Sequence, residues 1–225
     1  MNYTILTNFI IYNIFAFSVI SMIDLVLYQI NDNGRWFLLH SIVNGIIVYY
    51  SVNDTFGCFQ DPNNSILPIE NKFAGAYAVS LHIYHYIHFK MSKIDYIHHF
   101  VSVFAATPLC MIYQTRGISM MYFFGTGLPG GINYLCLYLM KNDHMNKLTE
   151  KKINSYLNNY VRAPGLIITS YILWKDSLNE EGIKMGLYYS NKILSLLFYL
   201  NGSIFSKMAI ENYVETKEKR RHLSQ

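Results

Sequence analysis

The stretch SLHIYHYIHFKMSKIDYIHHF, residues 80–100, decides the fold that we expect for this chain. Two runs of apolar and aromatic residues lie on either side of the short basic segment KMSK, residues 90–93. If both runs are helical, so short a connection makes them antiparallel neighbours. The stretch also holds five of the eight histidines of the chain. We therefore expect a hairpin of two apolar helices with imidazoles between them.

The composition of the whole chain places this hairpin in a membrane. Of the 225 residues, 52% are hydrophobic and only 14% are charged, whereas soluble domains carry about 25% charged residues. The net charge of +4 is small and the basic residues are dispersed, which argues against nucleic acid as a partner. The three cysteines, Cys58, Cys110 and Cys136, show no metal-binding spacing and are odd in number. We expect buried or free thiols rather than a disulfide framework.

The predicted fold is all-α, a polytopic transmembrane bundle of about seven helices. A helix needs about 20 apolar residues to cross a bilayer, and backbone groups in lipid must be satisfied within the helix. The second candidate span is short and the sixth is barely long enough, so six spans remain an alternative. The candidates are residues 5–28, 36–50, 73–89, 95–113, 117–140, 157–174 and 185–210.

Basic residues predict the orientation of these spans. With the N-terminus outside, or lumenal, eleven Lys and Arg residues fall in inner segments and four in outer segments. Seven spans keep this alternation and leave the C-terminus in the cytosol. Residues 1–29 lack the basic start of a signal peptide, so we interpret them as a retained signal-anchor helix. Residues 30–212 would form the membrane domain, and residues 213–225 a basic cytosolic tail.

Two further features lie inside the predicted spans. The segment GTGLPGG, residues 125–131, should kink its helix because proline removes a backbone donor. Arg162, Lys192 and Lys207 also fall within spans. We expect their long side chains to extend to an interface.

The histidines form a pattern that predicts a site. His82, His85 and His88 recur at intervals of three, which places them within about 120° on one side of a helix. The next span opens with His98 and His99, and the hairpin should bring these rings to the first group in the cytosolic half of the membrane. Imidazole inside a span usually faces the bundle interior. The other interpretation is a network of hydrogen bonds that only holds the helices together.

Two more residues could join this site. Asp95 precedes His98 by three residues and lies on nearly the same face. Its carboxylate could orient a ring and raise its basicity, or it could simply cap the helix. His40 lies on the second predicted span, one turn before Asn44.

These segments, in this order, resemble the TLC-domain family of membrane proteins. The matching pieces are the pair His98-His99 with Asp95 upstream, RWFLLHSIVN at residues 35–44, and GTGLPGGINYLCLYLMK at residues 125–141. The resemblance covers residues 30–212. It implies a helical membrane bundle, usually in the endoplasmic reticulum, with a cytosolic C-terminus.

The family includes ceramide synthases, in which paired histidines are implicated in acyl transfer from coenzyme A to a sphingoid amine. Carried over, this role falls on His98 and His99, with Asp95 beside them. The spans here lack the acidic DxxD-type stretch of the synthases, so the chain looks closer to the small non-synthase members.

Several functions therefore stay open at this stage. The first is lipid binding, sensing or membrane-lipid homeostasis, with membrane lipids as partners and no cofactor or metal. The second is an acyl-CoA-dependent lipid N-acyltransferase, for which acyl-CoA is the co-substrate. A histidine-box metal oxidase and a transporter built on the GLPGG break are further alternatives. A homo-oligomer is compatible with each of them. Catalytic candidates are His98, His99 and Asp95, and supporting pocket candidates are His82, His85, His88 and His40.

Overall fold

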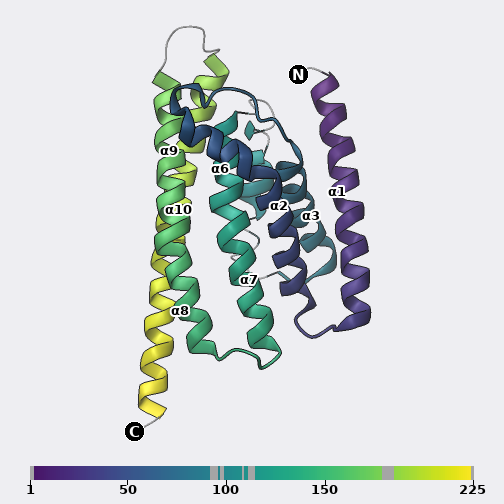
Figure 1. Ribbon diagram of the computed structural model, residues 1–225, viewed down its shortest axis with the longest axis vertical. Helices are drawn as coiled ribbons and strands as arrows, with labels where there is room; N and C mark the ends of the chain where they lie inside the picture. Colours follow the sequence, from purple (N-terminus) through teal and green to yellow (C-terminus); the bar gives the residue numbers. More distant parts are fainter. Residues whose placement is uncertain are drawn as a thin grey trace.

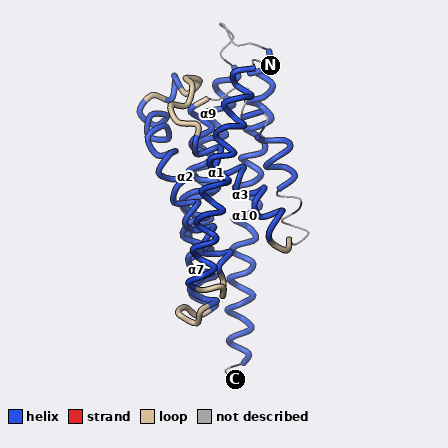
Figure 2. The backbone as a smooth tube through the Cα atoms, turned by 90° about the vertical axis from the view of Figure 1, so that its right-hand side faces the viewer, coloured by secondary structure: helices blue, strands red, loops and turns tan. Residues whose placement is uncertain are grey.

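The chain forms an elongated bundle of helices with its two termini at opposite ends (Figures 1 and 2). This computed structural model describes residues 3–91, 96, 99–107, 109–110, 115–178 and 185–223. The described residues are helical apart from turns and one isolated β-bridge between Pro68 and Thr115. The predicted all-α class is confirmed.

Three helices in the first part of the chain run alternately down, up and down the bundle (Figure 1). They are α1 (Tyr3–Ile30), α2 (Arg35–Gln60) and α3 (Phe73–His88), and the 3-10 turn η1 (Pro62–Asn64) lies before α3. Helix α3 agrees with the predicted span. The predicted end of the second span at residue 50 is wrong, because polar residues such as Asp54 continue the helix where a hydropathy search stops.

The second part of the chain contains π-helical stretches within its helices. The elements α6, η3 and α7 follow one another without interruption, and so do α8, η4 and α9. The bounds are η2 (Val101–Ala106), α6 (Arg116–Met121), η3 (Tyr122–Gly127), α7 (Leu128–Lys141), α8 (Lys147–Leu157), η4 (Asn158–Arg162), α9 (Ala163–Leu178) and α10 (Met185–Leu223).

Two predictions on this part can be compared directly with the structure. Within residues 125–131, where a kink was predicted, the helix continues and changes from π-helix to α-helix at Leu128, next to Pro129. The predicted tail at residues 213–225 is helical through Leu223, because α10 continues far beyond its apolar part. Helix α10 accordingly extends below the rest of the bundle in Figure 1.

Small residues allow close packing between the helices. Helix α10 packs along α9, α2 packs against both α3 and α7, and α1 packs on α3 at the edge of the bundle. The hydroxyls of Ser170 and Ser195 each donate to the backbone carbonyl of the other residue, both at 2.8 Å. Such contacts between small polar residues are typical of helix pairs in membranes. The three cysteines are free and buried, as predicted.

Polar contacts hold the lower end of the bundle, as it is drawn in Figure 1. The Asn31 amide donates to the Asn142 side chain at 2.9 Å, which ties the turn after α1 to the turn after α7. The Tyr84 hydroxyl donates to Asp24 at 2.8 Å, and Arg35 Nε lies 3.5 Å from the other Asp24 oxygen. A buried carboxylate thus joins α1, α2 and α3.

The upper end, where the N-terminus lies in Figure 1, has its own charged cluster. Arg116 at the start of α6 lies 2.8 Å from Glu70 and 3.9 Å from the buried Asp54 of α2. Lys175 of α9 donates to the side chain of Asn63 at 2.6 Å. Arg116 is therefore paired with two carboxylates, and Lys175 binds a neutral amide oxygen.

Between the two ends the outer surface is apolar. Residues Thr7–Ile30 and Met185–Leu223 form helices long and apolar enough to cross a membrane, and only 17% and 28% of their most apolar segments are buried. Ile14, Met22 and Leu25 are more than 60% exposed. The interior holds fully buried apolar side chains such as Ile20 and Leu166 together with polar ones such as Ser119 and Asn191.

Candidate functional site

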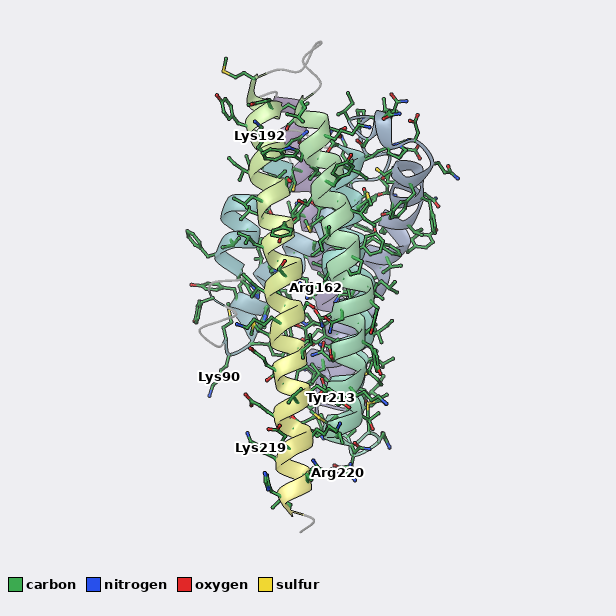
Figure 3. All side chains as sticks on the ribbon, turned by 90° about the vertical axis from the view of Figure 1, so that its left-hand side faces the viewer. Lys90, Arg162, Lys192, Tyr213, Lys219 and Arg220 are labelled. Atoms are coloured by element: carbon green, nitrogen blue, oxygen red, sulfur yellow. The ribbon has the colours of Figure 1, made fainter. Side chains whose placement is uncertain are left out.

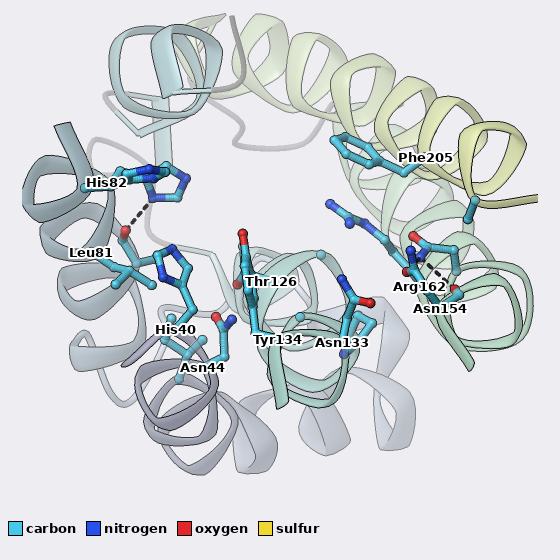
Figure 4. A pocket seen from close by; sticks show the side chains of 18 of the residues that line it. His40, Asn44, Leu81, His82, Thr126, Asn133, Tyr134, Asn154, Arg162 and Phe205 are labelled. Atoms are coloured by element: carbon cyan, nitrogen blue, oxygen red, sulfur yellow. Dashed lines mark hydrogen bonds between the residues drawn. The ribbon is translucent and has the colours of Figure 1, made fainter. Parts of the chain in front are cut away.

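A cavity of about 290 Å³ lies inside the lower half of the bundle (Figure 4). In Figure 4, His40 and His82 lie on one side of it, and Arg162 and Asn154 on the other. At about 30 Å³ per molecule of liquid water, the space would hold on the order of ten waters or a small headgroup. Its polar lining consists of His40, Asn44, His82, His85, His99, Thr126, Asn133, Tyr134, Asn154, Asn158, Arg162 and Asn212.

Four histidines converge on this cavity from three parts of the chain. The His99 ring lies 4.6 Å from the His82 ring and 4.9 Å from the His85 ring, measured between centroids. The His40 ring of α2 lies 5.7 Å from that of His85. The structure thus brings together three of the four predicted supporting residues and one member of the predicted pair.

Backbone contacts set the tautomer of two of these rings. His82 Nδ1 lies 2.6 Å from the carbonyl oxygen of Ala78, and His40 Nδ1 lies 3.1 Å from that of Trp36. A carbonyl only accepts, so in the neutral ring Nδ1 carries the proton and Nε2 is the acceptor. Each ring can therefore accept a hydrogen bond from a hydroxyl or amine, or take up a proton from one.

The prediction that His88 lines the pocket is wrong. The side chain is exposed and lies against Tyr84, with 4.3 Å between the ring centroids. Each step of three residues rotates the side chain by about 60° relative to a full turn, so the third histidine has left the face that His82 occupies. His98 and Asp95 lie outside the described residues.

Arg162 is a cavity residue that was not predicted. Its guanidinium faces the cavity, and it lies between the levels of Lys192 and Tyr213 along the bundle (Figures 3 and 4). It donates to Asn201 at 3.0 Å and lies 4.2 Å from the Phe205 ring. A signal was present, because Asn154, Asn158 and Arg162 recur every four residues and so share one helix face.

A second, smaller chamber of about 80 Å³ lies beside the cavity. Both spaces share His82, Thr126 and Arg162 in their walls. Beyond these residues the second chamber is mainly apolar. Its apolar lining includes Val79, Val101, Met121, Leu166, Leu197 and Phe198.

π-Helical stretches border both spaces. Each of the three in the described part of the chain, η2, η3 and η4, contributes residues to the wall of one or both chambers. A π-helix interrupts the regular helical ladder and is found frequently at functional sites. The irregular backbone here is buried in the bundle, where neighbouring helices can satisfy its polar groups.

The arrangement suits an amphiphile. A polar chamber beside an apolar one can hold a headgroup and the start of a chain together. Within the described residues, no group of three or more His, Cys, Asp or Glu side chains is placed to hold a metal.

No known protein family, curated protein or solved structure matches this chain.

Proposed function

We propose that the protein is a multi-pass membrane protein that binds an amphiphilic lipid inside its helical bundle. In this role it would act in lipid binding, sensing or membrane-lipid homeostasis, as the resemblance to the TLC-domain family implies. The observation that carries the proposal is the histidine-lined cavity with an apolar chamber beside it. A lipid headgroup fits the first space, and part of its chain fits the second.

The exposed surface supports a location in a membrane. The apolar helices α1 and α10 leave most of their length uncovered, and Tyr171 on α9 and Leu196 on α10 are more than half exposed. An apolar surface of this extent would be a liability in water. In lipid it is the expected surface of a bundle.

The path of the chain supports seven crossings. The termini lie at opposite ends of the bundle (Figure 1), as an odd number of crossings would place them. Basic residues are concentrated in the segments that would face the cytosol. With the N-terminus in the lumen, the cavity lies nearer the cytosolic side, and the endoplasmic reticulum is the membrane that the resemblance implies.

Co-purified lipid tests this proposal. The wild-type protein should be purified in detergent, and its bound lipids identified by mass spectrometry. The double variant His82→Leu/His85→Leu should lose most of the bound lipid, because the polar chamber loses two hydrogen-bonding rings. The variant His88→Leu changes the same residue type on the same helix outside the cavity, and should retain it. Equal lipid content in all three proteins would contradict the proposal.

A second candidate function is lipid N-acyl transfer, which the position of His99 between His82 and His85 favours. A neutral ring nitrogen would take the proton of an amine as that amine attacks a thioester carbonyl. A C–N bond then forms, the C–S bond breaks, and the coenzyme A thiol leaves with a proton. Amide formation from acyl-CoA and a sphingoid amine should then occur with wild type and disappear in His98→Ala/His99→Ala. Absence of product with the wild-type protein would exclude this activity for that substrate pair.

A further inference from the structure

Arg162 carries a charge that its described surroundings do not compensate. In the described part of the chain no carboxylate lies within 4.0 Å of its guanidinium, whereas Arg35 and Arg116 each have two such carboxylates. The side chain oxygen of Asn201 and the ring of Phe205 are neutral partners. Its Nε atom is buried and makes no hydrogen bond. An unpaired cation inside a bundle is costly and is usually functional.

The position of Arg162 indicates which part of a ligand it would contact. Along α10, Asn212 and Phe205 line the polar chamber. Phe198, about two turns above Phe205, lines the apolar chamber. Along η4 and α9, Asn158 is followed by Arg162 and then by Leu166. Arg162 borders both chambers, so it lies where a headgroup would meet its chain.

The size and chemistry of the two spaces narrow the ligand class. The apolar chamber, about 80 Å³, has room for part of one hydrocarbon chain and none for a second. Arginine binds carboxylate and phosphate oxygens through two parallel N–H donors. The Nε2 acceptor of His40 across the cavity suits a hydroxyl group further along a headgroup.

We propose that Arg162 selects single-chain amphiphiles with an acidic headgroup, whose anion binds the guanidinium and whose chain enters the apolar chamber. This inference rests on the proposed function, because it requires that the cavity binds lipid. A fatty-acid carboxylate and the phosphate of a lysophosphatidic acid share the required chemistry. Both should bind more tightly than neutral molecules with the same chain.

Binding of four probes with one chain length tests the proposal. The full-length protein in detergent is titrated with palmitic acid, palmitoyl lysophosphatidic acid, monopalmitoylglycerol and hexadecanol. In Arg162→Gln, affinity for the acidic probes should fall by on the order of ten- to a hundredfold, the range for a hydrogen bond to a charged group. Affinity for the neutral probes should stay the same, which also shows that the variant is folded.

Two further variants complete the experiment. Asn201→Asp places a carboxylate where the guanidinium now meets an amide, and should weaken the acidic probes without removing Arg162. Lys207 lies on α10, as Asn201 does, but outside the cavity, and its side chain is 76% exposed. Lys207→Gln removes this positive charge and should leave the affinity for all four probes unchanged. If Arg162→Gln does not fold, Asn201→Asp provides the same test.

The outcomes separate this inference from the function on which it rests. A lower affinity for either acidic probe in Arg162→Gln or Asn201→Asp supports the inference. The probe whose affinity falls identifies carboxylate or phosphate as the recognised group. Neutral and acidic probes that bind wild type equally would overturn the inference and leave lipid binding intact. A wild-type protein that binds none of the four probes would overturn the lipid-binding function for single-chain lipids, and the inference with it.

Discussion

The arginines at the two ends of the bundle are paired with carboxylates, whereas the arginine at its centre is not paired with one in the described part of the chain. At the lower end Arg35 lies beside Asp24, and at the upper end Arg116 lies beside Asp54 and Glu70. In the centre Arg162 has an amide and an aromatic ring within reach, and no carboxylate among the described residues. Matched charges at the ends hold helices together, whereas the unmatched charge in the centre leaves a position for a ligand.

The same contrast extends to the uncharged polar residues. At the lower end the side chains of Asn31 and Asn142 satisfy each other across two turns. Around the cavity, Asn44, Asn133 and Asn212 present amides to an open space. A polar group that lines a space large enough for water or ligand is available for binding, and one that closes a turn is not. Substitutions at the two regions should therefore have different effects.

The largest expected effect is the loss of the buried carboxylate at the lower end. Asp24→Leu removes the partner of both Tyr84 and Arg35, and should lower the free energy of unfolding by about 3 kcal/mol, the lower end of the range for a broken buried pair. The side chain of Asp24 is only 9% exposed. Unfolding in detergent, followed by tryptophan fluorescence as a denaturing detergent is added, measures this loss.

Asp32 provides the matched control for this prediction. It contacts the same arginine, with 3.2 Å from Arg35 Nε to Asp32 Oδ1, but its side chain is 69% exposed. Exposed ion pairs contribute at most about 1 kcal/mol, so Asp32→Leu should change stability little. Equal losses for Asp24→Leu and Asp32→Leu would show that burial does not distinguish these two pairs.

A smaller effect, of opposite sign, is expected at the centre. Arg162→Met removes an uncompensated charge and fills the same space with an apolar chain, so the lipid-free protein should be unchanged or up to about 1 kcal/mol more stable. The same variant should bind acidic lipids less well. Unfolding of delipidated wild type and Arg162→Met measures the difference. A loss comparable to that of Asp24→Leu would mean that Arg162 serves structure rather than binding.

The smallest effect concerns the wall of the cavity. A methyl group added at Gly130 would lie 2.9 Å from the Asn44 amide nitrogen, whereas one at Gly131 would make an ordinary contact at 3.4 Å. Gly130→Ala should displace Asn44 within the cavity and weaken lipid binding by a few-fold, since part of one hydrogen bond is lost. Gly131→Ala should bind as wild type does. Identical affinities for the two variants would exclude Asn44 as a ligand contact.

Sequence patterns predict much of the fold because apolar helices follow simple rules. The apolar run at residues 73–89 becomes α3 almost residue for residue. Polarity misleads the same approach for α2, because Ser51, Asp54 and Thr55 are buried against other helices rather than exposed in a loop. Hydropathy measures apolar character only. It therefore does not detect the part of a helix that continues through buried polar residues.

The site is less predictable than the fold. Spacing within one helix identifies His82 and His85 but wrongly adds His88, because a step of three residues drifts around the helix. The inward direction of Arg162 depends on Asn201 and Phe205, which lie 39 and 43 positions later in the chain. Contacts over that separation arise from packing of α9 on α10, which a pattern along one helix does not contain.

Photo-crosslinking can show whether a lipid occupies the interior of the bundle. A single-chain acidic lipid with a diazirine in the first part of its chain is bound to the purified protein and irradiated, and the adducts are mapped by peptide mass spectrometry. We expect adducts at Leu166, Leu197 and Phe198 of the apolar chamber, and excess unlabelled lipid should suppress them. Adducts confined to exposed residues such as Ile14 and Met22 of α1 would contradict this expectation.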